Sequence, residues 1–339
     1  MTSIDIFNNL EYLLGNVYSY NNTKVISMIN PNDLSFVSYT AMPKSGGCCV
    51  RFITNSPKIK IIYSITDPLI GNFPHIGISA QRGLSCSYRR IKEKYWRNID
   101  GVNSRENTGE ITIESHRWIP NSEYYEMAVY LPINCFITHL EILIEENATI
   151  QSGKNMLNRK IMLLGGTDSY GIGITGTQFQ LSNLLSRHIA NSYITNISFN
   201  SNNLWSIYKQ VITLIPELNQ QDLFLLEIPI LQEYTSENKK DVFDFIASLC
   251  ERVNGKIAIW HKPCFEHIYL KSSPFWENII SEIDLKYEPV NKIFFNDSFL
   301  IKNNHEYDMY MSSGKFINDN GSIFIMRKVV ELAEDLWNT

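Results

Sequence analysis

The chain has 339 residues, of which 44% are hydrophobic and 19% charged, so it is long and apolar enough to bury a sizeable core. Its length favours about two domains. The formal net charge of −5 excludes a generally basic, nucleic-acid-binding surface, and the densest basic stretch, residues 89–97, is typical of a solvated segment.

Short β-strands separated by turns are predicted over the first 150 residues. Alternating or continuous apolar stretches occupy residues 49–54 and 58–65, on either side of the turn at 55–57. Similar stretches follow at 110–114, 124–131 and 140–144. No long helix is expected after about the first 15 residues, and the elements of residues 66–108 cannot be placed. This pattern predicts a β-sandwich.

From about residue 159, near-continuous apolar strands alternate with helices. Strands are predicted at 160–164, 193–198, 222–227, 256–260 and 290–295, and helices at about 177–190, 203–217, 238–253, 274–285 and 320–337. Strands without a polar face are typical of a parallel sheet that helices cover on both faces. Because ligands of such sheets bind beyond the carboxyl ends of the strands, the loop at 165–173 is the first candidate site.

The other motifs favour no metal, no cofactor and no membrane segment. His261, Cys264 and His267 form an H-x-x-C-x-x-H pattern, but no fourth zinc ligand stands nearby and a packed loop is favoured. The six cysteines include no C-x-x-C pair. The N-terminus does not resemble a signal peptide, and no window offers the ~20 apolar residues of a membrane span. A soluble, cytoplasmic protein without a nucleic-acid partner is expected.

Several short motifs occur in a fixed order along the chain: SGGCCVRFIT at 45–54, YLP at 130–132, IMLLGGTDSYGIG at 161–173, NISFNSN at 196–202 and DMYMSSGKFINDNG at 308–321. In this order and spacing they resemble the blocks of the SGNH (GDSL-type) hydrolases, in the group with an N-terminal jelly-roll domain. The resemblance implies a jelly-roll β-sandwich at 1–150. It then implies a three-layer, flavodoxin-like α/β domain at 155–339 with a five-stranded parallel sheet. The family includes ester hydrolases and acyltransferases.

The residues that carry this family's chemistry are replaced. The family uses a serine nucleophile after the first strand and a histidine base, which an aspartate three residues earlier orients. The aligned positions hold Thr167, Phe316 and Ser313. Ser201, followed by Asn202, stands where the family has an oxyanion glycine. Since phenylalanine cannot take a proton, the resemblance predicts the scaffold without the triad.

Alternative routes to catalysis stay open. Shifting the first block by two residues would make Ser169 the nucleophile, with Asp168 before it, as in the family's GDS motif. Thr167 itself could attack, and His305 is the nearest remaining histidine. Asp168 and Glu227, at the carboxyl ends of adjacent predicted strands, could instead act as acid and base or bind a cationic group. Helix capping or a backbone hydrogen bond is the more common role of such carboxylates and is the one expected here.

The favoured hypothesis is a degenerate SGNH-type protein that binds a small acyl or aromatic ligand, or a protein partner, for example in a biosynthetic complex. The backbone N–H groups of Gly166 and Thr167 would attract a polar head, and Phe316 would pack on the apolar body. The alternative is an active ester hydrolase or acyltransferase with a rearranged nucleophile, and either a homo- or a hetero-oligomer is open. The predicted ligand pocket consists of Gly165, Gly166, Thr167, Ser201, Asn202, Glu227, Ser313 and Phe316.

Overall fold

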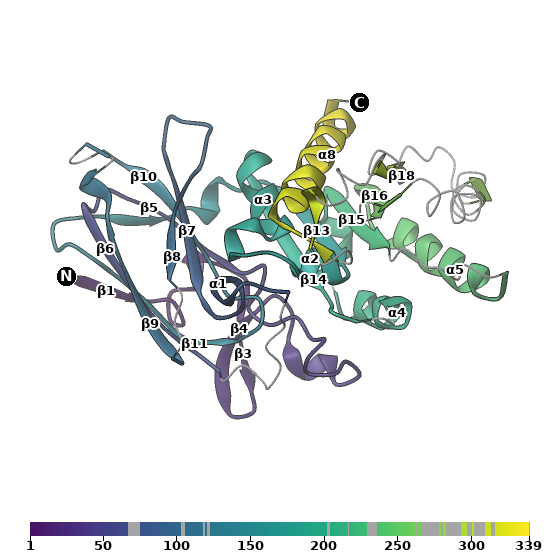
Figure 1. Cartoon of the computed structure of the whole chain (residues 1–339), viewed down its shortest axis with the longest axis horizontal. Coiled ribbons are helices and arrows are strands. Elements are labelled where there is room, and N and C mark those ends of the chain that lie inside the picture. The colour runs from purple at the N-terminus through teal and green to yellow at the C-terminus, as the bar shows by residue number, and fades with distance from the viewer. Residues whose placement is uncertain are drawn as a thin grey trace.

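The computed structural model describes residues 1–66, 75–102, 106–117, 119–120, 123–201, 204–215, 217–228, 236–261, 264–265, 278, 281–282, 293–296, 300–301, 309–312 and 316–338. Two antiparallel sheets form its N-terminal part (Figure 1). The first sheet has the order β3 (Asn16–Tyr20), β4 (Thr23–Ser27), β11 (Ile137–Ile144), β6 (Lys58–Ile65) and β9 (Thr108–Glu114), and β1 (Thr2–Asp5) also pairs with β11.

The second sheet runs through the segment that the sequence left unplaced. Its order is β12 (Ile150–Ser152), β5 (Cys49–Thr54), β10 (Tyr125–Tyr130), β7 (Leu84–Arg90) and β8 (Arg97–Val102), and β2 (Leu13–Leu14) pairs with β5. The short helix α1 (Ile78–Arg82) precedes β7. Inward-facing residues of both sheets, such as Val50, Ile61 and Val129, form one buried cluster, as alternation along the strands requires.

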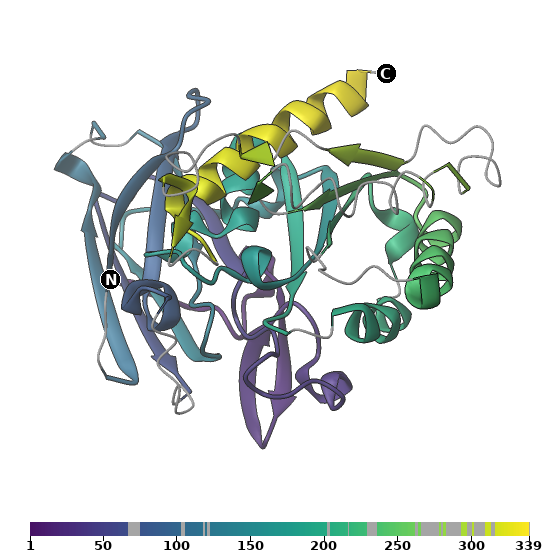
Figure 2. The ribbon, with the colours of Figure 1, turned by 45° about the vertical axis from the view of Figure 1, so that its right-hand side comes forward.

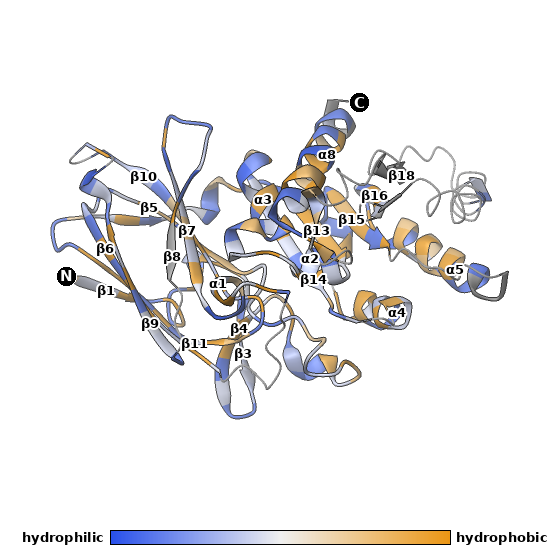
Figure 3. Ribbon diagram, in the orientation of Figure 1, coloured by the Kyte–Doolittle hydropathy of each residue, from blue (hydrophilic) through white to orange (hydrophobic). Residues whose placement is uncertain are grey.

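A parallel sheet follows the sandwich. Its order is β14 (Ser192–Ser198), β13 (Arg159–Gly165), β15 (Leu223–Ile228), β16 (Lys256–His261) and β18 (Ile293–Asn296). Figure 3 shows that apolar residues are concentrated along β13 and β15, in the middle of this sheet. Neighbours in the order pair in parallel register, so the carboxyl ends of β13 and β15 meet at one edge of the sheet.

Helices cover both faces of the parallel sheet (Figure 2). Ile161 and Leu163 of β13 face a cluster with α3 (Leu181–His188) and α8 (Asp319–Asn338). Met162 and Leu164 face the opposite cluster, with α4 (Leu204–Leu214) and α5 (Ser236–Arg252). The alternation along β13 is the one that a strand between two helical layers needs.

The apolar core on the α4 and α5 face continues into the N-terminal part. Val25, Leu34 and Phe136 belong to the same buried cluster as Met162 and the inner residues of α4. The two parts of the chain therefore share one hydrophobic core as well as the short connection after β12.

The coarse prediction of a β-rich N-terminal region followed by a parallel sheet with helices is confirmed. The strands expected at 49–54 and 58–65 have the predicted bounds. The helix expected at 177–190 is shorter, because residues Thr177–Phe179 form a single 3-10 turn and Gln180 is extended before α3 begins. The helix expected at 274–285 lies largely outside the described residues.

Two further observations concern segments that the sequence singled out. In the described part of the chain, no helix combines the length and the hydropathy that a membrane crossing needs. His267, of the H-x-x-C-x-x-H pattern, lies outside that part. Among the residues described, no three His, Cys, Asp or Glu side chains gather as they would around a metal ion.

Candidate functional site

A tight turn joins β13 to the short helix α2 (Thr167–Tyr170) at the carboxyl edge of the parallel sheet. Gly166 is the N-cap and offers no side chain to the helix, and Gly171, with φ +107°, ends the helix in the left-handed conformation. A Cβ on Gly166 would lie 2.6 Å from Leu204 Cδ1 and 3.0 Å from Glu227 Oε1, so a larger residue there would displace one or both of these side chains. The two glycines thus hold α2 close to the neighbouring elements.

The carboxylate of Glu227, from the adjacent strand β15, caps α2. Its Oε2 accepts the N–H groups of Gly166 and Ser169, each at 2.9 Å, and its Oε1 accepts that of Asp168 at 3.4 Å. These are donors that a helix start leaves unpaired, and the helix dipole favours negative charge beside them. The expectation that the Gly166 N–H would be free to bind a ligand is therefore wrong, because Glu227 already binds it.

Two carboxyl groups are buried together at this turn. Asp168 is 3% exposed and Glu227 is 4% exposed. Burial is the main cause that raises the pKa of Glu227 from 4.5 to about 7, the nearby Asp168 raises it further, and hydrogen bonds from Ser169 and Gly166 oppose the shift. The carboxyl group of Glu227 therefore titrates near neutral pH.

The raised pKa of Glu227 makes stability depend on pH. The folded chain holds this proton up to about pH 7, whereas an unfolded chain releases it near 4.5, so the free energy of unfolding should fall as pH rises through this window. The difference of 7 − 4.5 = 2.5 units corresponds to about 3 kcal/mol at most. Urea unfolding at pH 5 and pH 8 measures the fall, and Glu227→Gln should remove most of it. Equal falls in the variant and the natural chain would contradict this assignment.

The two candidate nucleophiles differ in access. Thr167, the first residue of α2, is half-buried, and its hydroxyl makes no hydrogen bond to a described residue. Ser169 is fully buried, and its Oγ lies only 2.6 Å from the place that a Cβ on Gly165 would take. An external ester could reach Ser169 only if α2 moved.

Side chains from β14 and from the start of α3 hold the far side of α2. Asn196 Nδ2 donates to the Ser169 carbonyl oxygen at 3.3 Å, and Gln180 Nε2 donates to that of Tyr170 at 3.0 Å. The Gly47 N–H of the sandwich donates to Gln180 Oε1 at 2.9 Å. The helix that carries Thr167 is therefore fixed from both ends and by both parts of the chain.

Phe316, at the family's histidine position, lies in an apolar cluster beside α2. It begins the short strand β21 (Phe316–Ile317), which pairs with β20 (Met311–Ser312). Its ring packs with Tyr170, Ile172 and Ile174. This surrounding is suited to an apolar side chain and offers no proton transfer.

A histidine from the sandwich lies against Phe316. The ring centroids of His75 and Phe316 are 4.9 Å apart, with the planes tilted by 40°. His75 lies just before α1, and Phe316 comes 241 positions later in the chain. Sequence reasoning missed this residue, because nothing in the local pattern of a loop reports which distant segment it will contact.

The structure brings half of the predicted pocket residues together at the start of α2: Gly165, Gly166, Thr167 and Glu227. Phe316 contacts the same helix from β21, through Tyr170. Ser201 lies after β14 and is half-buried. Asn202 and Ser313, and also the candidate base His305, lie outside the described residues.

Comparisons with known proteins relate the N-terminal part of the chain to one family. Residues 39–150 match the family model described as GxDLY, the N-terminus of Esterase_SGNH_hydro-type. No curated protein matches the chain.

Two solved structures share the fold of the whole chain. One is a GDSL-like lipase candidate from Bacteroides ovatus ATCC 8483, with a TM-score of 0.71 and 19% identity over 99% of this chain and 98% of that one. The other is the Salicylyl-Acyltransferase SsfX3 from a tetracycline biosynthetic pathway, with a TM-score of 0.65 and 12% identity over 96% of each chain. At these identities the likeness is one of fold.

Proposed function

We propose that this chain, which carries the N-terminal domain of the SGNH-type esterases and folds along its length like a GDSL-like lipase, binds a ligand instead of hydrolysing an ester. The observation that supports this most is the position of Glu227. An oxyanion needs donors that are preorganised and vacant, and the N–H groups of Gly166 and Ser169 donate to a carboxylate. Above about pH 7, where Glu227 is ionised, it would also repel a second negative charge.

The base position supports the same proposal. Phe316 lies among apolar side chains, where the family would require a histidine that takes a proton from the nucleophile. Its half-buried ring leaves apolar surface beside Tyr170 of α2, which suits an acyl or aromatic group. The ligand that we propose for this cleft has such a group and is not turned over, or the surface is taken by a protein partner.

The proposal also covers the exact fold type of each part and the compartment in which the protein works. The sandwich is a jelly roll, the parallel sheet is the five-stranded sheet of the SGNH fold, and the protein works in the cytoplasm. In support of a reducing compartment, Cys48, Cys49 and Cys86 are buried thiols, and burial raises the pKa of Cys49 and Cys86 to about 12. Thiols in this state are unreactive, which suits a structural role.

The direct test is esterase activity. The pure protein should not hydrolyse short-chain nitrophenyl esters above the buffer rate, because removing the base of a triad alone costs several orders of magnitude in rate. Thr167→Ala should leave the rate at that background. Saturable turnover by the natural chain, lost in Thr167→Ala, would overturn the proposal.

A second candidate is an ester hydrolase or acyltransferase that uses Thr167 with His75 as its base. The contact of His75 with Phe316 favours it, because the sandwich brings an imidazole close to the place of the family's histidine. In that case His75→Gln and Thr167→Ala should each reduce turnover by about a hundredfold or more. The matched control is His116→Gln, since His116 is an exposed residue of the sandwich that follows β9.

A further inference from the structure

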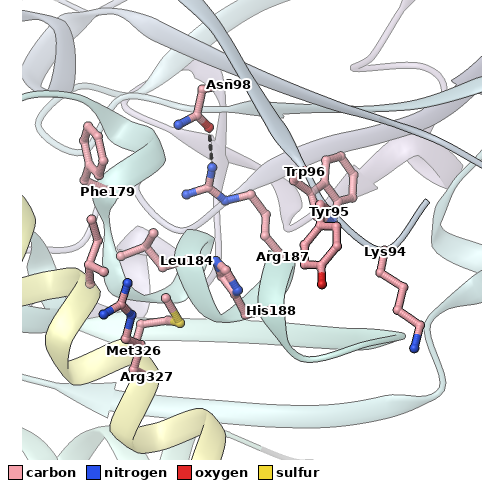
Figure 4. Close-up of a pocket in the computed structure, with 11 residues that line it drawn as sticks. Lys94, Tyr95, Trp96, Asn98, Phe179, Leu184, Arg187, His188, Met326 and Arg327 are labelled. Carbon is pink, nitrogen blue, oxygen red and sulfur yellow. Dashed lines mark hydrogen bonds between the residues drawn. The ribbon is translucent and has the colours of Figure 1, made fainter.

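A hollow of about 290 Å³ lies between the sandwich and the α/β part, away from the start of α2 (Figure 4). The connection between β7 and β8, the end of α3 and the middle of α8 form its walls. His188 is the last residue of α3, at the end of the helix away from α2, whereas Phe179 lines the hollow and also packs against the cluster of Tyr170. No described residue of α2 lines the hollow, so it is a separate site that neighbours the first.

Basic side chains converge on this hollow, and none of the described residues that line it carries a carboxylate. Lys94, Arg187, His188 and Arg327 come from three different elements. Neither Lys94, His188 nor Arg327 forms an ion pair or side-chain hydrogen bond with a described residue. The nearby acid Glu93 pairs with Arg97 instead. The three cations among the lining residues, Lys94, Arg187 and Arg327, repel one another, and a bound anion would relieve this repulsion.

Arg187 is fixed in place at the back of the hollow. Its guanidinium donates to Asn98 Oδ1 (Figure 4). It also donates to the Gln178 carbonyl oxygen at 2.6 Å and to Ser87 Oγ at 3.3 Å. All of these partners are neutral, so the positive charge of Arg187 is not compensated. Together with partial burial, Arg187 and Arg327 lower the pKa of His188.

The helix dipole of α3 by itself explains why Arg187 and His188 stand where they do. It does not explain the positions of Lys94 and Arg327. Arg187 and His188 both lie in the last turn of α3, where the helix dipole favours positive charge. Arg327 lies in the middle of α8 and Lys94 in a loop, so no helix end accounts for them. Their convergence on one hollow needs a different explanation.

The rest of the lining is apolar and aromatic. Phe179, Leu184 and Met326 form one side of the hollow, and Tyr95 and Trp96 stand on the other (Figure 4). Tyr95 is 80% exposed, which is unusual for a large aromatic side chain without a partner. A ring that entered the hollow would contact apolar side chains on both sides.

We propose that this hollow binds a small organic anion, a carboxylate or phosphate monoester that carries a planar apolar ring. The anionic group lies between Arg327 and His188, in the field of Arg187, and the ring packs between Tyr95 and the side formed by Phe179 and Met326. Arg327 is suited to this role because its planar fork binds carboxylate and phosphate oxygens in pairs. This site is independent of the proposed function of the α2 cleft.

Calorimetric titration of the full chain with benzoate and with phenyl phosphate tests the proposal. At least one of the two should bind saturably, and Arg327→Gln should weaken that binding about tenfold or more, since it removes a charge-assisted pair of hydrogen bonds. Lys328→Gln is the matched control, because Lys328 is the next residue of α8, pairs with Glu331 and does not line the hollow; its effect should stay below about twofold. Tyr95→Ala should weaken binding of phenyl phosphate but not of inorganic phosphate.

The comparison of ligands separates the parts of the proposal. Benzoate bound more tightly than phenyl phosphate supports a carboxylate ligand, and the reverse order supports a phosphate monoester. Benzyl alcohol that binds as tightly as benzoate would overturn the role of the cations. Inorganic phosphate that binds as tightly as phenyl phosphate would overturn that of the ring. Absence of saturable binding up to millimolar concentration, or equal losses in Arg327→Gln and Lys328→Gln, would overturn the site.

Discussion

Glu227→Ala is expected to lower the free energy of unfolding by about 3–5 kcal/mol at pH 5.5, because it leaves three buried N–H groups at the start of α2 without an acceptor and a cavity between α2 and β15. The acidic pH matters. With its pKa raised to about 7, the carboxyl is mostly protonated there, so its removal brings little relief of buried charge. Urea unfolding followed by far-UV circular dichroism measures the loss.

Glu227→Gln is the control for this prediction. It keeps the size of the side chain and one oxygen that can accept the Gly166 and Ser169 N–H groups, so the loss at pH 5.5 should be under about 1.5 kcal/mol. If Glu227→Ala also lost less than about 1.5 kcal/mol, water would have to satisfy the N–H donors of α2. The start of α2 would then be open to a ligand, which would also weaken the proposal that Glu227 closes the hydrolase centre.

Glu126→Gln is expected to cost about 3–5 kcal/mol of stability, because it leaves two arginines of the sandwich without a counter-charge. Glu126 is fully buried on β10, and its carboxylate binds Arg51 at 2.6 Å and Arg89 at 2.6 Å. Arg89 is its cross-strand partner on β7. Chemical denaturation of the variant and of the natural chain gives the difference.

The same substitution should disturb the proposed anion site. Both guanidinium groups lie over the ring of Trp96, at 5.1 Å for Arg51 and 5.0 Å for Arg89, so Glu126 indirectly fixes the loop that carries Tyr95. Glu110→Gln is the matched control, since Glu110 pairs with Lys60 on the exposed face of the first sheet and should cost under about 1 kcal/mol. A cost below that value in Glu126→Gln as well would show that water reaches Arg51.

Some strands could be predicted to the residue and others not at all. In β6, buried and less buried residues alternate, because one of its faces meets the sandwich core. In β5 nearly every residue is buried, so its apolar pattern is almost continuous. Strand β7 was missed because Ser85 and Ser87 are buried beside its apolar residues. Ser87 Oγ donates to Asn98 and accepts from Arg187 of α3, so its burial depends on an element about a hundred residues away.

The sequence by itself determined the order of the elements, the family resemblance, and the place of Thr167, Asp168 and Glu227 at the carboxyl edge of a parallel sheet. These follow from apolar periodicity and turn residues, which act over a few neighbouring positions. Only the tertiary structure decided that Glu227 caps α2, that His75 meets Phe316 and that cations from three elements surround one hollow. The physical reason is that helix ends and buried charges take whichever partner the packing of distant segments brings near, and local sequence does not report that partner.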